Sequence, residues 1–487
     1  MTFEELKTEI IFQNRSKVTA DSRLVEQGGT FVAIRGSHND GRSFIAQAIE
    51  NGAKYIVAES RPENIPLKKP IEFIIVESAP RAAGILAQGQ FQNPADKLTN
   101  LAVTGTNGKT TVAFIVRSII NNASEKCGLI STVLYDTTEK IIDSRLTTPG
   151  QFTIAELMQQ MVKAGAKFMV TEASSHALDQ DRLWGVKFKA AAFTNLSGDH
   201  LDYHKTSEKY LAAKTKVFSS LSEDSFAILN KQSVHSAQIA GETKAEILWY
   251  AIDEDADIRA DIKSMDITGT EFRIEYKGLS RDVKTALVGR YNISNCLAAA
   301  GLCIAARFDL EAIAAGIESL KSIPGRLQKI EQTGDFTVLV DYAHTDDALK
   351  NVLETLKPLC KGRLIVVFGC GGDRDRSKRP RMAKVVQKYA DMIIVTSDNP
   401  RSENPDEIIS DIIGGFERAD TEDIKIEPDR RKAIGLAIDN AGKDDIVVIA
   451  GKGHENYQIL ADRTIDFSDK ETAKKILREK IDKIFSK

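Results

Sequence analysis

The chain has 487 residues, of which 42% are hydrophobic and 28% charged, and its formal net charge is -3. The length predicts about three domains, the charge gives no electrostatic case for nucleic-acid binding, and no run approaches about 18 consecutive apolar residues. The N-terminus has acidic residues and no apolar core of a signal peptide. We therefore expect a cytoplasmic, monomeric protein that acts on small molecules, without nucleic-acid or membrane partners.

Residues 1–93 alternate strand and helix patterns and predict a small α/β domain. Strand patterns cover 30–34, 55–58 and 72–76, with a helical pattern after the first. Polar turns lie on both sides of that strand, at 21–23 and 36–41. Such loops bind ligands in α/β sheets, although ordinary surface loops have the same composition. The polar segment 91–98, which contains Pro94, is the expected linker to a second domain.

Residues 101–112, LAVTGTNGKTTV, have the strand, glycine-rich turn and helix order of a phosphate-binding loop. Glycines let backbone N–H groups face phosphates, Lys109 can reach the outer phosphates, and the Thr110 hydroxyl can bind Mg²⁺. The strict GxxxxGK[ST] motif would need glycine at 103, where the chain has Val103. A chance glycine-rich turn is the alternative.

The next two strands end in further candidate ligands. Glu172 follows an apolar strand and can complete a Mg²⁺ shell with Thr110, although a buried or capping glutamate has the same pattern. His200 and His204 have the i, i+4 spacing of zinc ligands, but HLDYH lacks the glutamate of HExxH and no third ligand is indicated. Lysines on the helix at 207–221 are interpreted as solvated, and the segment from 226 to 276 as antiparallel edge strands.

Residues 328–487 repeat strand and helix patterns and predict a doubly wound, Rossmann-like domain. Four strands end in polar groups, at 341–344, 369–376, 398–401 and 451–455. On one edge of a parallel sheet these would form a crevice rich in Asp and Arg, suited to a zwitterionic ligand. The GCGGDRD loop lacks GxGxxG, so we expect no redox cofactor.

Ordered motifs over nearly the whole chain resemble the Mur ligases: TGTNGKTT, EASSH, DHLDYH, the AAK of Lys214, GRYNISN, PGR, DYAHT, GGDRD, DNPRSE and GKGHE. The family loop does not require glycine at 103. The resemblance implies an N-terminal UDP-binding domain at 1–93, a central P-loop ATPase domain with a mostly parallel sheet at 94–327, and a C-terminal amino-acid-binding domain at 328–487. Leu146 and Ala20 depart from the common family pattern.

The resemblance also implies an activity and its residues. The implied reaction is ATP-dependent joining of meso-diaminopimelate to the D-glutamate γ-carboxylate of UDP-N-acetylmuramoyl-L-Ala-D-Glu through an acyl phosphate, in peptidoglycan synthesis. The implied catalytic residues are Lys109, Lys214, Glu172, His200 and Arg326. ATP would be bound by Gly105, Thr106, Asn107, Gly108, Lys109, Thr110, Thr111, Asn292, Asn295, Arg326, Asp341 and His344. Mg²⁺ would be bound by Thr110, Glu172, His200 and Lys214 as a carbamate.

Two further sets of residues are implied for the other substrates. The muramoyl-dipeptide nucleotide would be bound by Ser22, Ser37, His38, Asn39, Thr147, Thr148, Ser174, Gln180 and Arg182. Diaminopimelate would be bound by Arg374, Asp398, Asn399, Pro400, Arg401, Gly451 and Glu455.

Arg401 is the residue that favours diaminopimelate over lysine as the acceptor. Diaminopimelate has a second carboxylate, which a bidentate guanidinium can bind, and the lysine-adding relatives lack this arginine. A surface ion pair is the alternative role for Arg401. Ligation of L-lysine, a P-loop NTPase without ligase activity, and a non-catalytic UDP-sugar-binding module remain the rival functions.

Overall fold

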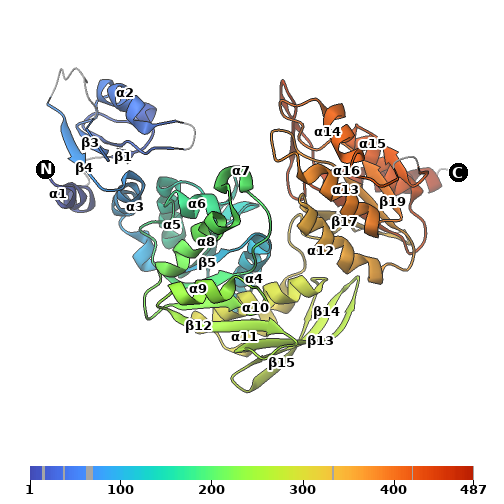
Figure 1. Ribbon diagram of the computed structural model, residues 1–487. Coiled ribbons are helices and arrows are strands. Elements are labelled where there is room, and N and C mark those ends of the chain that lie inside the picture. The colour runs from blue at the N-terminus through green and yellow to red at the C-terminus, as the bar shows by residue number, and fades with distance from the viewer. Residues whose placement is uncertain (14–16, 37–38, 62–69, 332–333, 419–420, 486–487) are drawn as a thin grey trace.

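The computed structural model describes residues 1–13, 17–36, 39–61, 70–331, 334–418 and 421–485. It contains a four-stranded, an eleven-stranded and a six-stranded sheet, each with its own helices. In Figure 1 the central part, in green and yellow, connects the blue N-terminal part with the orange C-terminal part. The three-domain α/β architecture predicted from the sequence is confirmed.

The N-terminal sheet is parallel, in the order β1 (Val18–Thr19), β2 (Thr30–Val32), β3 (Tyr55–Ala58) and β4 (Glu72–Ile75). Its helices are α1 (Phe3–Thr8), α2 (Ile45–Glu50) and α3 (Ala79–Gln90). Successive β2 residues face opposite sides, so Phe31 packs with the α2 residue Ile45 and Val32 with Leu86 of α3. The sequence patterns missed β1, because two residues are too few to show a period.

The central sheet has the order β15-β14-β13-β12-β11-β10-β5-β9-β6-β7-β8. The bounds are β5 (Thr99–Thr104), β6 (Cys127–Ile130), β7 (Leu134–Asp136), β8 (Ile141–Asp143), β9 (Phe168–Glu172), β10 (Phe188–Phe193), β11 (Phe226–Asn230), β12 (Glu246–Ile252), β13 (Ile258–Asp266), β14 (Gly269–Tyr276) and β15 (Leu279–Thr285). Only part of the predicted antiparallel edge is antiparallel. β11 pairs in parallel with β10 and β12, and β12 pairs in parallel with β13, whereas β13 and β14 pair antiparallel. A period of two does not distinguish the two directions.

Helices cover both faces of this sheet. One face is buried under α4 (Lys109–Asn122), α10 (Arg290–Ala305) and α11 (Leu310–Ser319), which contribute apolar side chains such as Ile115, Leu297 and Ile313 to one core. The other is covered by α5 (Gln151–Lys163), α6 (Ser175–Asp179), α8 (Ser207–Ser219) and α9 (Ser236–Glu242), with Met158 and Phe218 in a second core. The short α7 (Leu201–His204) precedes α8. The phosphate-binding loop therefore starts from β5, a central strand that is covered on both faces, whereas edge strands such as β8 and β15 are largely exposed.

The C-terminal sheet has the order β16-β17-β21-β18-β19-β20 and is parallel except for β16. Its strands are β16 (Gln328–Lys329), β17 (Thr337–Asp341), β18 (Leu364–Phe368), β19 (Met392–Val395), β20 (Ile424–Ile426) and β21 (Ile446–Ala450), and β22 (Tyr457–Ile459) and β23 (Thr464–Asp466) form a hairpin. One face of the sheet is covered by α12 (Asp346–Leu356), α13 (Lys378–Tyr389) and α14 (Pro405–Ile413). The other face is covered by α15 (Arg430–Asn440) and α16 (Asp469–Phe485). The predicted doubly wound domain is confirmed. Among the described helices, none is both long and apolar enough to cross a bilayer.

Candidate active site

The loop between β5 and α4 requires glycine at two positions. Gly105 and Gly108 have φ angles of +147° and +89°. A Cβ atom at Gly105 would lie 1.9 Å from Thr194 Oγ1, and one at Gly108 would lie 2.3 Å from Asn295 Oδ1. Val103, where the strict motif has glycine, is still inside β5 and in register with Glu172. Its side chain therefore leaves the loop free to turn.

Two lysines, the half-buried Lys109 and the buried Lys214, converge on this loop. The Lys109 ammonium donates to the carbonyl oxygens of Gly105 at 3.0 Å and Thr106 at 2.8 Å, and Lys214 Nζ donates to the same Gly105 oxygen at 2.8 Å. Burial lowers the pKa of Lys109, and it lowers the pKa of Lys214 well below its usual value, helped by the positive charge of Lys109. Lys214 is 1% exposed, so its interpretation as a solvated helix lysine is wrong.

Acidic and imidazole groups face the same space. Glu172, at the end of β9, is fully buried and accepts hydrogen bonds from the N–H and hydroxyl of Thr132 at 2.8 and 2.9 Å. Burial lowers the pKa of His200 to about 4, although the Asp199 carboxylate opposes this shift. Burial would raise the pKa of Asp199 itself, but His200 and His344 outweigh it and the net shift is downward. Near neutral pH the site therefore presents an uncharged imidazole beside a carboxylate.

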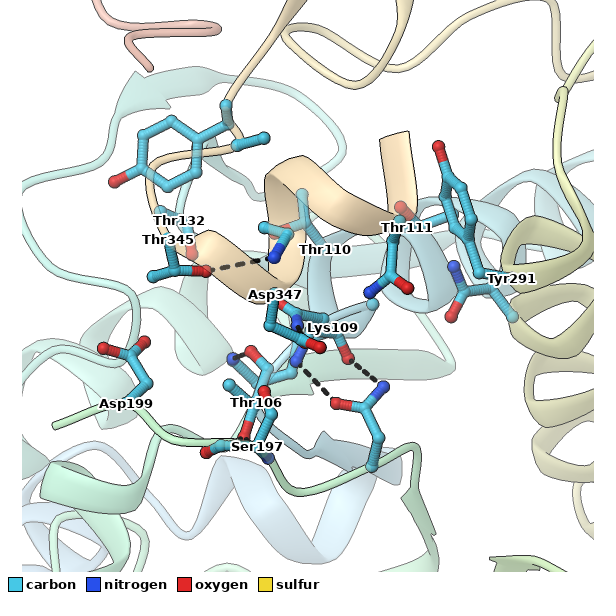
Figure 2. A pocket seen from close by; sticks show the side chains of 18 of the residues that line it. Thr106, Lys109, Thr110, Thr111, Thr132, Ser197, Asp199, Tyr291, Thr345 and Asp347 are labelled. Carbon is cyan, nitrogen blue, oxygen red and sulfur yellow. Dashed lines mark hydrogen bonds between the residues drawn. The ribbon is translucent and has the colours of Figure 1, made fainter. Parts of the chain in front are cut away.

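The C-terminal domain and the segment that leads into it contribute side chains to the phosphate loop. The Arg326 guanidinium donates to the Thr110 hydroxyl at 3.1 Å and lies 4.6 Å from the centre of the Tyr342 ring. Asp347, in the first turn of α12, accepts a hydrogen bond from the Asn107 amide at 2.8 Å. Figure 2 shows Asp347 of this helix among the side chains that line the same cavity as Lys109 and Thr110. These contacts are polar, so phosphate oxygens can replace them.

Two further residues predicted for ATP lie at the end of β17 and just after it. Asp341 accepts hydrogen bonds from the backbone N–H groups of Leu327 and Ala343, and burial raises its pKa. The His344 Nδ1–H donates to the Tyr342 carbonyl at 2.7 Å, which fixes the ring, and burial lowers the pKa of His344. Both side chains are thereby held at the edge of the C-terminal sheet.

A polar cavity of about 500 Å³ lies between the central and C-terminal domains (Figure 2). All five predicted catalytic residues line it. So do most residues predicted for ATP and two predicted for the dipeptide nucleotide: Thr106, Asn107, Gly108, Lys109, Thr110, Thr111, Asn292, Asn295, Arg326, Asp341 and His344, with Thr147 and Ser174. A cavity of this size with convergent polar groups is typical of a nucleotide or cofactor site.

The sequence and the fold match known proteins in all three domains. Residues 16–91 match the Mur ligase family catalytic domain, 103–303 the Mur ligase middle domain, and 325–453 the Mur ligase glutamate ligase domain. A Clostridium tetani protein named UDP-N-acetylmuramoyl-L-alanyl-D-glutamate--2,6-diaminopimelate ligase is 40% identical over 461 residues, 94% of each chain. An Aquifex aeolicus protein of the same name is 42% identical over 94% of this chain and 93% of its own.

The chain belongs to the Mur ligase family. A solved structure of a protein with that same name superposes on this Mur ligase with a TM-score of 0.68, at 33% identity over 95% of both chains. The Thermotoga maritima MurF ligase in complex with ADP has a TM-score of 0.61 at 18% identity, over 96% and 98% of the two chains, and shares the fold. The family membership inferred from the motifs is confirmed.

Most residues predicted for the dipeptide nucleotide form a second cluster in this Mur ligase, beside Glu172. The Thr148 hydroxyl donates to the Glu172 carbonyl at 2.6 Å and contacts Ser174 Oγ at 3.1 Å. Arg182 donates to the Thr148 carbonyl and to Gln180 Oε1, at 2.9 and 2.7 Å. This cluster adjoins the cavity through Ser174, which lines it.

The remaining residues predicted for the nucleotide belong to the N-terminal domain. Ser22 donates to Gln47 Oε1 at 2.6 Å, and the carbonyl of Asn39 accepts from the Gly36 N–H at 2.8 Å. Ser37 and His38 lie outside the described residues. The contacts of Ser22 and Asn39 are internal to their domain, so a ligand would have to span two domains to meet them and the Thr148 cluster together.

Residues predicted for diaminopimelate cluster at the carboxyl ends of β18, β19 and β21. Asn399 donates to Glu455 Oε2 at 2.9 Å, and a Cβ atom at Gly451 would lie 2.6 Å from Asp398 Oδ2. The half-buried Arg401 donates through Nη1 to the carbonyls of Gly372 and Asn399, at 2.8 and 3.4 Å. Backbone oxygens rather than a carboxylate therefore hold its guanidinium. Pro400 and the exposed Arg374 belong to the same two loops.

Several polar residues of the cavity were missed by sequence reasoning. The Tyr210 hydroxyl contacts Thr106 Oγ1 at 3.2 Å, and its ring lies 4.4 Å from Lys214 Nζ. Tyr210 is one helical turn before Lys214, and this i, i+4 spacing on a helix could have identified it. Asn107 and Asp347, in contrast, are 240 positions apart, and no sequence signal joins them.

The donor groups near the loop fit Mg²⁺ only together with substrate. Among the described residues, no group of three or more His, Cys, Asp or Glu side chains is placed to hold a metal ion. Mg²⁺ commonly uses one or two protein carboxylates, with waters and substrate phosphates as the other ligands. Thr110, Glu172 and His200 all line the cavity and supply oxygen and nitrogen donors of this kind. The residues are compatible with an ion that arrives with ATP.

Proposed function

We propose that this Mur ligase uses ATP to join meso-diaminopimelate to the γ-carboxylate of UDP-N-acetylmuramoyl-L-Ala-D-Glu. Support comes from the relatives of that name, which are about 40% identical over nearly the full length. The observation that carries the choice of amino acid is Arg401. Its guanidinium is held by neutral carbonyl groups, so its charge is available to the distal carboxylate of diaminopimelate.

The proposed reaction needs ATP because a carboxylate is a poor electrophile. One γ-carboxylate oxygen attacks the terminal phosphorus of ATP, and the bond to the bridging oxygen breaks to release ADP. The amine of diaminopimelate then attacks the acyl phosphate, loses a proton, and displaces phosphate to leave the amide. Lys109 stabilises the negative charge on the transferring phosphoryl group, and bound Mg²⁺ would neutralise phosphate charge further.

Arg326 is proposed to move from Thr110 to the phosphates of ATP when the nucleotide binds. In the structure its guanidinium donates to the Thr110 hydroxyl. A triphosphate offers stronger, charged acceptors, so the guanidinium would leave Thr110 and free that hydroxyl to meet a metal ion. The C-terminal domain, which follows Arg326 in the chain, would then move toward the nucleotide.

Lys214 is proposed to carry a carbamate. Burial favours its neutral amine, the form that adds to CO₂ with formation of an N–C bond and loss of one nitrogen proton. The product carries a negative charge where the amine had none. That charge, close to Lys109 and His200, would complete the proposed metal ligands Thr110, Glu172 and His200.

Phosphate release provides the test of the proposed function. The purified protein is incubated with ATP, Mg²⁺ and the UDP-muramoyl-dipeptide, with diaminopimelate, L-lysine or no amino acid. Release that requires diaminopimelate and yields the tripeptide supports the proposal. Release with L-lysine alone indicates a lysine ligase, release without an amino acid an NTPase, and no release a binding module.

Arg401→Ala tests the acceptor assignment. We expect KM for diaminopimelate to rise by roughly 30-fold or more, with KM for ATP changed by less than about twofold, because a charge-assisted contact to one substrate is lost. Arg401→Lys is the matched control and should recover only part of the loss, since an ammonium lacks the bidentate fork. Equal rises in both KM values would remove the recognition role of Arg401.

A further inference from the structure

Lys452 is a fully buried lysine in the loop after β21, among the residues proposed to bind diaminopimelate. Its Nζ donates to Asn399 Oδ1 at 3.1 Å and to Glu455 Oε2 at 3.0 Å, and lies 3.8 Å from Asp398 Oδ1. Desolvating an ammonium is costly unless its partners compensate. All three partners here belong to the proposed amino-acid site, and neither the motifs nor the proposed mechanism gives Lys452 a role.

The Lys452 ammonium orients the two side chains that it contacts. Asn399 is held on both sides of its amide: Oδ1 accepts from Lys452 and from the Ile459 N–H at 3.0 Å, and Nδ2 donates to Glu455 Oε2 at 2.9 Å. Within the described residues, both hydrogen bonds to the Glu455 carboxylate use Oε2. The other oxygen, Oε1, is therefore the one that remains for a ligand ammonium.

The same contacts set the net charge of the wall formed by Asp398, Asn399, Lys452 and Glu455. Asp398 and Glu455 are two carboxylates a short distance apart, and Lys452 offsets one of them. The neighbouring Arg430 is fully buried in a pair with Asp469, at 2.7 Å, and adds no net charge. One negative charge thus remains in surplus, which suits the single ammonium of a distal amino-acid head.

We infer that Lys452 is a specificity-determining residue that adapts this wall to a zwitterionic head rather than to a bare alkylammonium; this rests on the proposed function. Without Lys452, two uncompensated carboxylates would repel the distal carboxylate of diaminopimelate. They would attract the side chain of L-lysine, whose distal group carries only a positive charge. Lys452 and Arg401 therefore both favour diaminopimelate over L-lysine. Lys452 limits the negative charge near the distal carboxylate, and Arg401 supplies a positive charge that binds it.

Lys452→Met, which keeps the length of the side chain and removes its charge, is the first test. We expect KM for diaminopimelate to rise about tenfold or more, with KM for ATP and for the dipeptide nucleotide within about twofold of wild type. The ratio of kcat/KM for L-lysine to that for diaminopimelate should rise by about tenfold. Lys388→Met, an exposed lysine of α13, is the matched control and should leave the ratio unchanged.

Glu455→Gln and the double variant Lys452→Met/Glu455→Gln separate charge from packing. Glu455→Gln lowers the negative charge of the wall, so the L-lysine to diaminopimelate ratio should fall below that of the double variant, which has the wild-type surplus. This comparison decides the inference even when Lys452→Met alone does not fold. A ratio that is the same in all folded variants, or a joint rise of all three KM values, would overturn it.

The wild-type assay keeps the two proposals distinct. Failure of wild-type protein to use diaminopimelate would refute the proposed function. Wild-type use of diaminopimelate with an unmoved ratio in the variants would refute only the role of Lys452.

Discussion

The N-terminal and C-terminal domains join the central domain through contacts of opposite character. At the N-terminal junction α3 packs against α5, and Gly84 is so close to the central domain that a Cβ atom would lie 2.2 Å from the Trp184 carbonyl oxygen. The Arg81 guanidinium lies 4.1 Å from the Trp184 ring centre and 3.1 Å from Asp181. Backbone and ring atoms fill this junction, which leaves little freedom for movement.

The C-terminal junction is built around the 500 Å³ cavity instead. Its direct contacts include the polar pair Asn107 with Asp347 and the half-buried Ile267, which packs against the C-terminal core. At the end of the central domain, Arg326 adds a polar contact to Thr110 beside the cavity. Polar contacts between domains can be exchanged for contacts with phosphates at little cost, whereas a packed junction must be disrupted. The difference indicates that the nucleotide acts on the C-terminal junction while the N-terminal one stays fixed.

Lys109→Ala should give the largest effect. It removes a positive charge from the cavity at the C-terminal junction, where we expect the phosphates of ATP to bind. We expect ATP turnover to fall by about 10³-fold or more, as for loss of a preorganised charge at a phosphoryl group. The thermal midpoint should change little, since both hydrogen bonds of Lys109 go to carbonyls that water can also serve. Lys163→Ala, an exposed lysine of α5, is the control. Near-normal turnover of Lys109→Ala would refute the phosphate role.

Gly84→Ala tests the packed junction. A methyl group would meet the Trp184 backbone, so we expect a loss of about 1–3 kcal/mol in the free energy of unfolding. Fluorescence of Trp184, measured in a Trp249→Phe background because the chain has a second tryptophan, reports on this junction during urea unfolding.

Gly435→Ala is the matched control for Gly84→Ala. Gly435 is also a helical glycine, but its added Cβ would have its nearest neighbour, Ile476 Cδ1, at 3.8 Å. We expect this change to be neutral or stabilising. Equal stability of the two variants would mean that the N-terminal junction is looser than its contacts suggest.

Acid should loosen the C-terminal domain through Glu403. The buried Arg379 guanidinium donates to this carboxylate at 2.9 and 3.0 Å and is the main cause that lowers its pKa from 4.5 to about 2. Because the folded pKa lies below the unfolded one, the pair stabilises the domain above about pH 4.5 and loses this contribution as the pH falls toward 2. Hydrogen exchange of peptides from α13 and α14 measures the loss.

Glu403→Gln is the control for the acid experiment, because a neutral amide cannot titrate. Its exchange rates in α13 and α14 should depend less on pH between 4.5 and 2 than those of wild type. If the central domain opens together with the C-terminal domain, the polar junction couples them more tightly than argued above. Identical pH dependence in both proteins would refute the role of the Arg379–Glu403 pair.

The parts of the site that could be predicted from sequence are those whose chemistry is contiguous. Residues 105–111 and Glu172 stand at strand ends, where a short apolar run and a polar turn reveal them. The burial of Lys214 could not be predicted from α8 alone, because that helix carries several charged residues. Only the contact of Lys214 with the Gly105 carbonyl, which belongs to another element, shows that this lysine is shielded from water. Family resemblance pointed to it, while the physical reason comes from the fold.

Contacts between residues far apart in the chain were the other limit. Lys452 lies in a recognised motif, but its burial depends on Asn399, which is 53 positions away. The fold followed similar lines: long apolar strands were predicted, whereas the two-residue β1 and the parallel pairing of β12 with β13 were not. Periodicity records which side of a strand is buried and carries no information on which strand lies beside it.

Asp347→Ala should give the smallest effect, and it distinguishes the junctions most directly. Asp346 and Asp347 are both in the first turn of α12, so replacing either should cost only about 0.3–1 kcal/mol of helix stabilisation. Only Asp347 accepts from Asn107 of the central domain, whereas Asp346 pairs with Arg381 of its own domain. Without nucleotide, Asp347→Ala should therefore increase the radius of gyration in solution scattering, and Asp346→Ala should not. Unchanged scattering of Asp347→Ala would show that the apolar contact at Ile267 holds the domain instead, which would make the C-terminal junction a packed one as well.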